Sequence, residues 1–288
     1  MIFPPVLYLF IFCYIPMFGL IIAFKDYKFN LGIFGSKWNG LDNFRFLFES
    51  NTFGTLVKNT IGYNFIFIIV GTISAIFVAL MLDVMKNKIF IKFYQGSMFM
   101  PYFLSWIVVS YVTHALFNYE SGLLNSILAK MGAEGISWYS EPKYWPYILT
   151  ILNVWKGIGY NSLVYYGTIL SIDPALFEAA TIEGCSYIRK LWNITLPHLK
   201  PTVIILTLLS IGGIFRSDYG LFFYIPKDIG ALYKATDVLD TYILRSIRSI
   251  GNMGAASAAG FLQSVVGCIV VVTMNGIVRK VDNENSLF

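Results

Sequence analysis

Six long apolar stretches, separated by polar segments, run through the 288-residue chain. A helix needs about 20 mostly apolar residues to cross a hydrocarbon layer about 30 Å thick. Each stretch is about that long, so the pattern predicts an all-α membrane protein with six transmembrane helices. The predicted spans cover roughly residues 3–24, 61–82, 94–117, 145–170, 199–217 and 255–278.

The first apolar stretch, from Phe3 to Phe24, differs from a secretory signal peptide. No basic residue precedes it, no small-residue cleavage site follows it, and its apolar run is longer than the h-region of a signal peptide. We therefore interpret it as a retained span. The missing basic flank also suggests a natural N-terminus that is longer than the sequence shown.

The distribution of basic residues predicts which segments face the cytoplasm. An even number of spans places both chain termini on one side, together with segments 83–93 and 171–198. Lys and Arg are slightly denser there than in the opposite segments, at about 25–60, 118–144 and 218–254. Because basic residues concentrate in cytoplasmic loops, we expect both termini in the cytoplasm.

Composition supports the membrane assignment and excludes several other classes. Only 13% of the residues are charged and 57% are apolar, whereas soluble domains carry about 25% charged residues. The net charge of +5 forms no basic stripe, which argues against a nucleic-acid partner. Three cysteines and two histidines lack metal-ligand spacing. We expect no metal site, no catalytic set and a single membrane domain over residues 1–288.

The polar segment 171–198, between the fourth and fifth stretches, carries clear helix signals. Asp173 is expected to cap a helix whose first position is a proline, where a missing N–H costs nothing. Gly184 tolerates the left-handed conformation that ends such a helix. Ser186 is expected to cap a second helix that ends before Pro197. The segment is therefore predicted to form two helices joined by a sharp turn, at the cytoplasmic mouth of the bundle.

This segment resembles the EAA loop of bacterial ABC importer permeases. The resemblance rests on the spacing of Glu178, Ala179, Ala180, Gly184, Ile194 and Pro197. In that family the first helix of the loop, the coupling helix, fits a cleft on a cytoplasmic ATPase subunit. The resemblance implies ATPase coupling through these six residues, with ATP and Mg bound by partner subunits and no cofactor on this chain.

Other parts of the chain resemble carbohydrate-uptake permeases of the MalF-like, LplB-type branch. These parts are Tyr14–Met17, Ala23–Tyr27, Gly40–Phe44 and the C-terminal Ser286–Phe288. The resemblance implies a bacterial cytoplasmic membrane and a heterodimer with a second permease subunit, served by two ATPase subunits and an extracellular solute-binding protein. A departure from the maltose permease is the absence of its large loop domain and added N-terminal spans, which argues against maltose as the substrate. We expect an oligosaccharide.

Polar residues in the predicted fourth and fifth spans indicate a solute pathway. On the fourth, an amide, an ammonium and a phenol share one helical face by their spacing, and on the fifth two hydroxyls do so. Such a face suits a wet cavity that binds sugars, although Lys156 could instead pair with a buried carboxylate or reach the membrane interface. The predicted pathway residues are Asn153, Trp155, Lys156, Tyr160, Asn161, Ser210 and Ser217.

The sequence thus predicts a transmembrane permease subunit of an ATP-driven, binding-protein-dependent importer of an oligosaccharide. The chain contains no Gly-x-x-x-x-Gly-Lys-Ser/Thr motif, so we do not expect it to hydrolyse ATP or to be an enzyme. An ion-coupled secondary transporter of a small polar solute is the alternative. That class predicts paired intramembrane carboxylates or inverted repeats, and neither is evident in the sequence.

Overall fold

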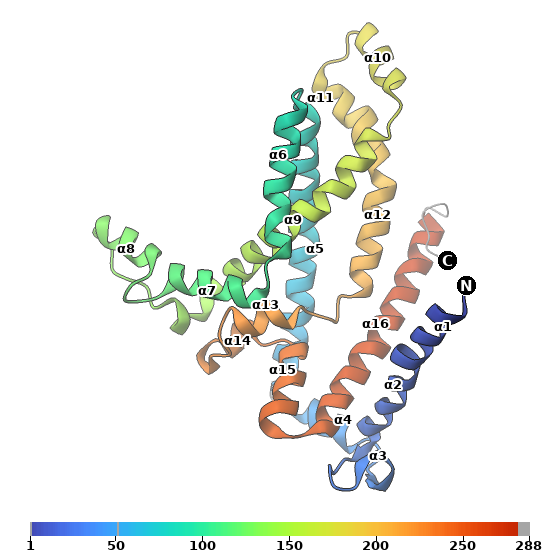
Figure 1. The fold of residues 1–288 in the computed structure, drawn as a ribbon, viewed down its shortest axis with the longest axis vertical. Helices are drawn as coiled ribbons and strands as arrows, with labels where there is room; N and C mark the ends of the chain where they lie inside the picture. The colour runs from blue at the N-terminus through green and yellow to red at the C-terminus, as the bar shows by residue number, and fades with distance from the viewer. Residues whose placement is uncertain (1, 51, 282–288) are drawn as a thin grey trace.

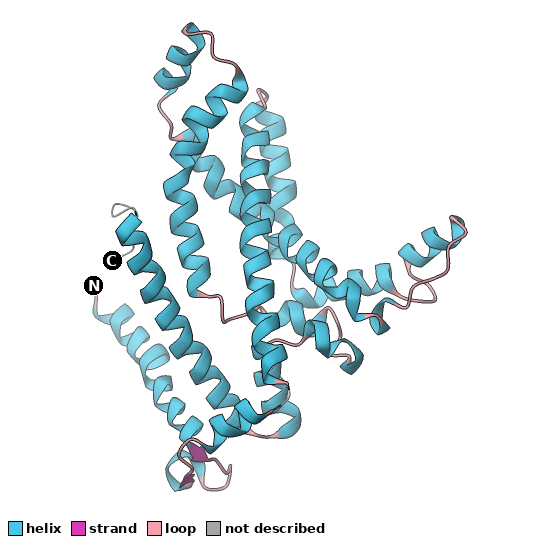
Figure 2. Ribbon diagram, turned by 180° about the vertical axis from the view of Figure 1, so that it is seen from behind, coloured by secondary structure: helices cyan, strands magenta, loops and turns pink. Residues whose placement is uncertain are grey.

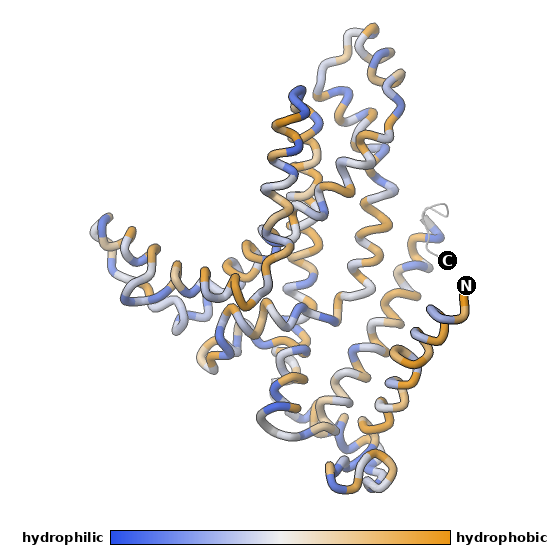
Figure 3. The backbone as a smooth tube through the Cα atoms, viewed as in Figure 1, coloured by the Kyte–Doolittle hydropathy of each residue, from blue (hydrophilic) through white to orange (hydrophobic). Residues whose placement is uncertain are grey.

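The computed structural model describes residues 2–50 and 52–281, and these residues form a largely helical chain. Several long helical rods run along the longest axis, and a two-stranded hairpin lies at one end (Figures 1 and 2). Apolar residues dominate the rods, while polar residues gather at the turns (Figure 3). The C-terminal Ser286–Phe288, which resembles the permease branch in sequence, lies outside the described residues.

The N-terminal part contains two rods joined by the hairpin. The first rod consists of α1 (Phe3–Leu9), η1 (Phe10–Tyr14), α2 (Ile15–Met17) and η2 (Phe18–Phe24). Strand β1 (Lys25–Asp26) pairs antiparallel with β2 (Lys37–Trp38), and α3 (Gly32–Gly35) lies between them in the chain. The second rod is α5 (Phe53–Val84), which follows α4 (Asp42–Glu49) and begins earlier than the predicted span 61–82.

The rest of the chain alternates long helices with short ones. The middle contains α6 (Lys88–Phe99), η3 (Met100–Phe103), α7 (Trp106–Phe117), α8 (Leu123–Lys130), η4 (Trp138–Ser140), η5 (Pro142–Tyr144), α9 (Trp145–Leu170) and α10 (Pro174–Ile182). The C-terminal part contains α11 (Tyr187–Lys190), η6 (Leu191–Thr195), α12 (Leu196–Gly212), α13 (Tyr219–Tyr224), η7 (Gly230–Leu232), α14 (Tyr233–Thr236), α15 (Leu239–Arg245), η8 (Ser246–Ile250) and α16 (Met253–Val281).

The prediction of one uninterrupted span over 94–117 is wrong. Two helical segments, Lys88–Phe103 and Trp106–Phe117, meet at an angle of 98°. Pro101 has no N–H to donate and stands in the 3₁₀ turn where the first segment ends. Ser105 then adopts an extended conformation, and its Oγ accepts from the Val108 N–H at 3.3 Å, so it caps a new helix. Local capping chemistry therefore overrides the continuous apolar pattern.

The predicted helix end before Pro197 is also wrong. The chain from Tyr187 to Gly212 forms one rod through α11, η6 and α12. A π-helical turn, Leu191–Thr195, precedes Pro197 and starts a new hydrogen-bonding register. In the first turn of α12 a proline needs no N–H partner, so the rod continues past it. The rod then ends at Gly212, before the predicted limit of 217.

Four helices among the described residues are long and apolar enough to cross a membrane, and the bent pair would make a fifth. The four are Phe3–Phe24, Phe53–Val84, Tyr187–Gly212 and Met253–Lys280. Helix α9 has 26 residues but is less apolar, because amides and Lys156 occupy its central turns. The α5–α6 turn and the α10–α11 turn lie at the same end of the molecule (Figure 1), as expected for segments 83–93 and 171–198.

Three buried clusters hold the rods together. The first joins α5, α7, α9 and α13 around the fully buried Trp145, whose Nε1–H donates to the Trp138 carbonyl at 2.8 Å. The second joins α5, α9 and α12 around Tyr165, and the third joins η2, α4 and α16 around Phe44. Along α5 and α9, the stretch between the first two clusters carries most of the polar side chains described next.

Candidate solute pathway and coupling loop

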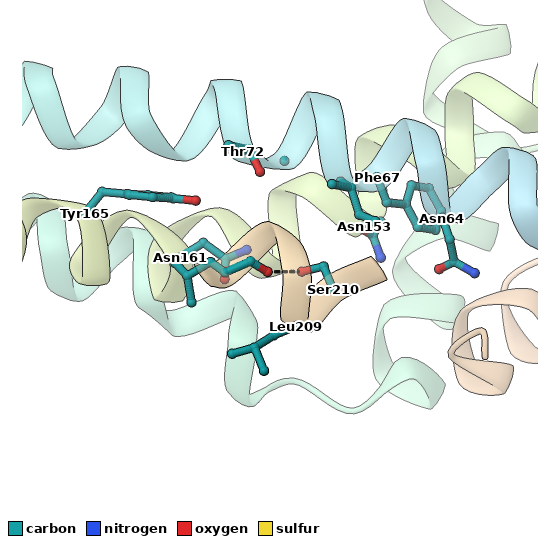
Figure 4. A pocket seen from close by; sticks show the side chains of 11 residues that line it. Asn64, Phe67, Thr72, Asn153, Asn161, Tyr165, Leu209 and Ser210 are labelled. Carbon is teal, nitrogen blue, oxygen red and sulfur yellow. Dashed lines mark hydrogen bonds between the residues drawn. The ribbon is translucent and has the colours of Figure 1, made fainter. Parts of the chain in front are cut away.

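A polar cavity of about 430 Å³ lies between α5, α9 and α12 (Figure 4). Its walls combine three side-chain amides and three hydroxyls with a few apolar groups. The amides belong to Asn64, Asn153 and Asn161, and the hydroxyls to Thr72, Tyr165 and Ser210. Small and apolar side chains complete the wall at Phe67, Ile68, Gly71, Leu206 and Leu209. Such a mixture offers hydrogen bonds to a hydroxylated solute together with apolar contact.

Helical spacing explains how α9 presents its polar side chains to this cavity. Asn153, Gly157 and Asn161 follow one another at intervals of four residues, which places them on one face. On the opposite side of the helix, α9 lies against α6 at Gly159, where a Cβ would collide with the backbone carbonyl of Met98. The missing side chain at Gly159 thus lets α9 and α6 pack closely against each other.

Helix α5 supplies Asn64 to one end of the cavity. The Asn64 Nδ2 group donates to the carbonyls of Ile214 and Arg216 at 2.9 and 3.1 Å. These carbonyls lie just past the end of α12, where backbone acceptors have no helical partner. Asn64 therefore ties the start of the loop after α12 to α5, while the hydroxyl of Ser210 stays within α12 by donating to the Leu206 carbonyl at 2.8 Å.

A second cavity, of about 270 Å³, adjoins the first and shares Phe67, Gly71, Asn153 and Asn161 with it. Its distinctive group is Lys156, whose Nζ donates to the Tyr102 carbonyl at 2.8 Å. That carbonyl lies near the C-terminal end of the first half of the broken helix. Helix ends leave carbonyls unpaired and carry partial negative charge, which favours an ammonium there.

The ammonium of Lys156 has no carboxylate partner in the described chain. Besides the Tyr102 carbonyl, it contacts the rings of Tyr102 and Trp106, with Nζ to centroid distances of 5.4 and 5.2 Å. Asp218 lines the same cavity, but its oxygens accept from the Gly220 N–H, at 2.9 Å, and from the Trp106 indole N–H. A positive charge therefore lies beside the cavity, held by a carbonyl dipole and two rings.

Three aromatic rings stack beside this ammonium. The rings of Tyr102 and Tyr160 lie 5.0 Å apart with an interplanar angle of 12°. Phe99 stacks on Tyr102 at 5.7 Å and 13°. Because Tyr160 comes from α9 and the other two come from the broken helix, the stack joins these elements, and Tyr102 and Tyr160 line the second cavity.

The structure gathers five of the seven predicted pathway residues around the two cavities. Asn153, Lys156, Tyr160, Asn161 and Ser210 line one cavity or both. Trp155 lines neither and is 41% exposed, because it is offset by two residues from Asn153 and so faces away.

Ser217 also lines neither cavity. Its hydroxyl lies 3.2 Å from Asn64 Nδ2, and its N–H donates to Asp240 at 2.7 Å. Burial raises the pKa of the Asp240 carboxyl, and this backbone bond acts in the opposite direction. Ser217 therefore fixes the loop after α12 to α15 and lies outside both cavities.

The predicted pathway residues do not include those that α5 and the broken helix contribute. Asn64 and Thr72 are polar positions eight residues apart in an apolar stretch, which would have indicated a second polar face. Tyr102 and Trp106 lacked such a signal, because their contribution depends on the bend between them.

The loop between α9 and α11 has the predicted local geometry. Asp173 Oδ1 accepts from the Ala175 N–H at 2.9 Å and caps α10. Gly184 has φ +74°, the left-handed region that favours glycine. The Ser186 hydroxyl accepts from the Arg189 N–H at 3.4 Å. These three predictions are confirmed.

Helix α10 carries Glu178, Ala179 and Ala180 away from the rest of the chain (Figure 1). None of its residues is buried, and Ile182 at its end is 88% exposed. By contrast, Ile194 and Pro197 belong to the rod that contains α12. The loop therefore offers a short exposed helix that is joined to the cavity-forming helices α9 and α12 on its two sides.

Comparison with known families identifies the class of protein. A family model described as "Binding-protein-dependent transport system inner membrane component" matches residues 67–281. This range includes the loop between α9 and α11 and every residue that lines the two cavities except Asn64. The chain belongs to this family, and the predicted class, a permease subunit of a binding-protein-dependent importer, is confirmed. The ion-coupled alternative gains no support.

Individual relatives cover nearly the whole chain. It is 31% identical to the polygalacturonan/rhamnogalacturonan transport system permease protein YteP of Bacillus subtilis, over 99% of this chain and 88% of the relative. It is 32% identical to the arabinooligosaccharides transport system permease protein AraP of Bacillus subtilis, over 82% of this chain and 74% of the relative.

A solved structure has the same fold. It is the crystal structure of a bacterial ABC transporter involved in the import of the acidic polysaccharide alginate. The similarity has a TM-score of 0.89 at 29% sequence identity and covers 98% of this chain and 94% of that one. A second structure, of the alginate transporter in complex with an alginate pentasaccharide-bound periplasmic protein, has a TM-score of 0.88 at 29% identity over 98% and 93%.

Proposed function

We propose that this chain forms one half of the membrane pathway of an ATP-driven importer for oligosaccharides that carry carboxylate groups. The observation that carries the proposal is the polar face of α9 along the two adjoining cavities. Its amides match sugar hydroxyls, and the ring of Tyr160 matches an apolar sugar face. The ammonium of Lys156, which has no carboxylate partner among residues 2–50 and 52–281, matches a uronate. Relatives named for polygalacturonan and alginate support the acidic class.

Uptake of matched solutes tests the role of Lys156. We expect Lys156→Gln to lower the uptake of oligogalacturonides about tenfold or more, because a hydrogen bond to a charged group contributes about 1.5–3 kcal/mol. Uptake of the same oligosaccharides with their carboxyls reduced to alcohols should change much less. Lys130→Gln, at the end of α8, is the control. Equal loss for both solutes would contradict carboxylate recognition without contradicting transport.

In the assembled importer, α10 docks on one of two cytoplasmic ATPase subunits, which bind ATP and Mg. Glu178, Ala179 and Ala180 supply the contact, and Gly184 sets the turn that orients it. Ile194 and Pro197 begin the rod through which a rigid-body movement of the loop reaches α12. A second permease subunit completes the pathway. An extracellular solute-binding protein delivers the oligosaccharide, and the complex of the alginate transporter with its periplasmic protein supports this partner.

The topology that fits this assembly has six spans, with α9 and the bent α6–α7 pair each counted as one, and cytoplasmic termini. Cys185, beside the turn at Gly184, is a natural probe of the loop. With Cys13 and Cys268 replaced by Ala, a membrane-impermeant maleimide should label Cys185 in inverted vesicles and not in intact cells. Co-expressed ATPase subunits should slow that labelling. Labelling from outside the cell would overturn the topology, and an unchanged rate would overturn the docking.

A further inference from the structure

A separate cavity of about 230 Å³ lies between the C-terminal end of α7, η4 and the loop that follows α13. It shares no lining residue with the two pathway cavities. His114, Tyr139 and Lys227 line it, together with Asn118. Two of these four residues carry a buried polar atom that has no hydrogen-bond partner in the described chain.

The first such atom is Nδ1 of His114, and its protonation follows from the neighbouring amide. Asn118 Oδ1 accepts from the N–H groups of Glu120 and Ser121 at 2.9 and 3.0 Å, which fixes the orientation of the amide. The Asn118 Nδ2 group, which can only donate, therefore faces His114 Nε2 at 3.3 Å. Because Nε2 accepts, the neutral ring carries its proton on Nδ1. His114 thus holds a buried N–H donor without a partner.

The second atom is the hydroxyl oxygen of Tyr139, whose ring lies 5.5 Å from that of His114. Burial raises the pKa of this phenol to about 12, so its proton stays in place at neutral pH. A buried polar group without a partner destabilises the folded state, and such groups are rare in folded proteins. Two of them beside one cavity indicate that the cavity normally holds an acceptor.

Lys227 adds a positive charge to the same cavity. Its Nζ lies 5.9 Å from the centre of the Tyr139 ring. Lys227 and Asp228 have φ values of 58° and 50°, in the left-handed region that strains a residue with a side chain. Backbone strain of this kind concentrates at functional sites.

An ion pair on the other side of the turn holds this strained conformation. Arg245 donates to Asp228 Oδ1 at 3.1 Å and to Asp237 Oδ1 at 2.9 Å. The carboxylate of Asp228 is therefore engaged by Arg245. As a result, the charge of Lys227 remains available to a ligand at the cavity.

We propose that this cavity is an anion-binding site, in which His114 Nδ1–H, the Tyr139 hydroxyl and the Lys227 ammonium bind one small oxyanion. The shared chemistry is a carboxylate or phosphate group, because all three protein groups donate hydrogen bonds. The oxyanion has two possible sources, a uronic acid unit and free inorganic phosphate. The site is distinct from the pathway cavities and does not depend on which solute is transported.

Ligand-dependent thermal stability tests the site on the full chain, purified in nanodiscs with its copurifying subunits. The probes are galacturonate, inorganic phosphate and galactose at constant ionic strength. We expect a saturable rise in Tm with one or both anions and none with galactose, because a ligand that binds only the folded state stabilises it. Galacturonate alone would identify a uronate site, and phosphate alone a phosphate site.

Two variants and a control make the result specific. Lys227→Met should weaken the apparent affinity about tenfold or more, since it removes a charge-assisted bond. Tyr139→Phe should also weaken it, while the ligand-free Tm stays the same or rises because an unpaired buried hydroxyl is removed. Lys234→Met, an exposed lysine outside this cavity, should change neither. No saturable rise with either anion, or an equal rise in Lys227→Met, would overturn the proposal.

Discussion

The polar face of α9 and the exposed helix α10 follow each other in the chain and are held in opposite ways. The α9 face is fixed from outside, by buried clusters on both sides, by close approach to α6 at Gly159 and by the carbonyl that binds Lys156. Helix α10 has no buried residue, and the contacts that shape it are its own caps and the bond from Lys190 Nζ to Thr181 Oγ1 at 2.5 Å.

This difference predicts how each region responds to substitution. A change on the α9 face disturbs several helices at once, because its side chains pack against neighbours from distant parts of the sequence. A change in the α10 loop alters the local backbone and leaves the packed rods intact. Global stability should therefore report on the first region, and coupling or local exchange on the second.

The largest expected effect is at Gly159. Gly159→Ala places a Cβ against the Met98 carbonyl and forces α9 away from α6. We expect a loss of about 3 kcal/mol, at the upper end for overpacking, because backbone rather than a flexible side chain must move. The thermal midpoint of the purified protein should fall accordingly. Gly167→Ala, on the same helix with open space around it, is the control and should have little effect. Equal behaviour of the two variants would contradict the close contact.

Gly184→Val should act locally and still abolish coupling. The left-handed backbone at φ +74° costs a non-glycine residue about 1–2 kcal/mol, more for a β-branched one. The protein should remain folded in the membrane while ATP hydrolysis loses its connection to uptake, measured as oligosaccharide imported per ATP hydrolysed. Asn tolerates this conformation better, so Gly184→Asn should keep much of the coupling. Normal coupling in Gly184→Val would show that this turn plays no part in linking ATP hydrolysis to uptake.

A smaller effect is expected at the start of α10. Asp173→Ala removes the cap on the Ala175 N–H, which contributes about 1 kcal/mol. Amide hydrogen exchange in the first turn of α10 should speed up about fivefold, with no change in the rods. Asp173→Asn keeps a capping oxygen and should exchange at nearly the original rate. Faster exchange throughout α9 would show that the loop is not independent.

The smallest effect is expected at Trp155, which faces away from both cavities. Trp155→Leu should leave oligosaccharide uptake within about twofold of the original rate, as for a surface substitution. Tyr160→Leu, which breaks the stack with Tyr102, should reduce uptake severalfold because an aromatic pair contributes about 0.5–1.5 kcal/mol. The opposite order would place the solute on the other face of α9.

The same contrast explains what the sequence could predict. The caps at Asp173 and Ser186 and the left-handed Gly184 depend on neighbours in the chain, so local rules were sufficient. The polar face of α9 followed from helical spacing, and the same spacing explains why Trp155, two residues from Asn153, lies off that face.

Features that depend on distant packing were harder to predict. The bend at Ser105 is hidden in a continuous apolar stretch, although Pro101 and Ser105 are the residues that create it. The role of the Tyr102 carbonyl requires that bend, together with a lysine 54 positions later in the chain. Asn64 faces the cavity because it binds carbonyls beyond α12, and the sequence does not reveal that pairing.

The bond between Lys156 and the Tyr102 carbonyl also bears on the bend between α6 and α7. An ammonium has three protons to donate, and Lys156 donates one of them to the Tyr102 carbonyl next to the bend. In the proposed importer, a carboxylate that bound the two remaining protons would draw the ammonium toward itself and weaken its bond to the carbonyl, and the coupling would act with the same free energy in both directions. Such a link would let a single side chain report the binding of an oligosaccharide to the bent helix pair.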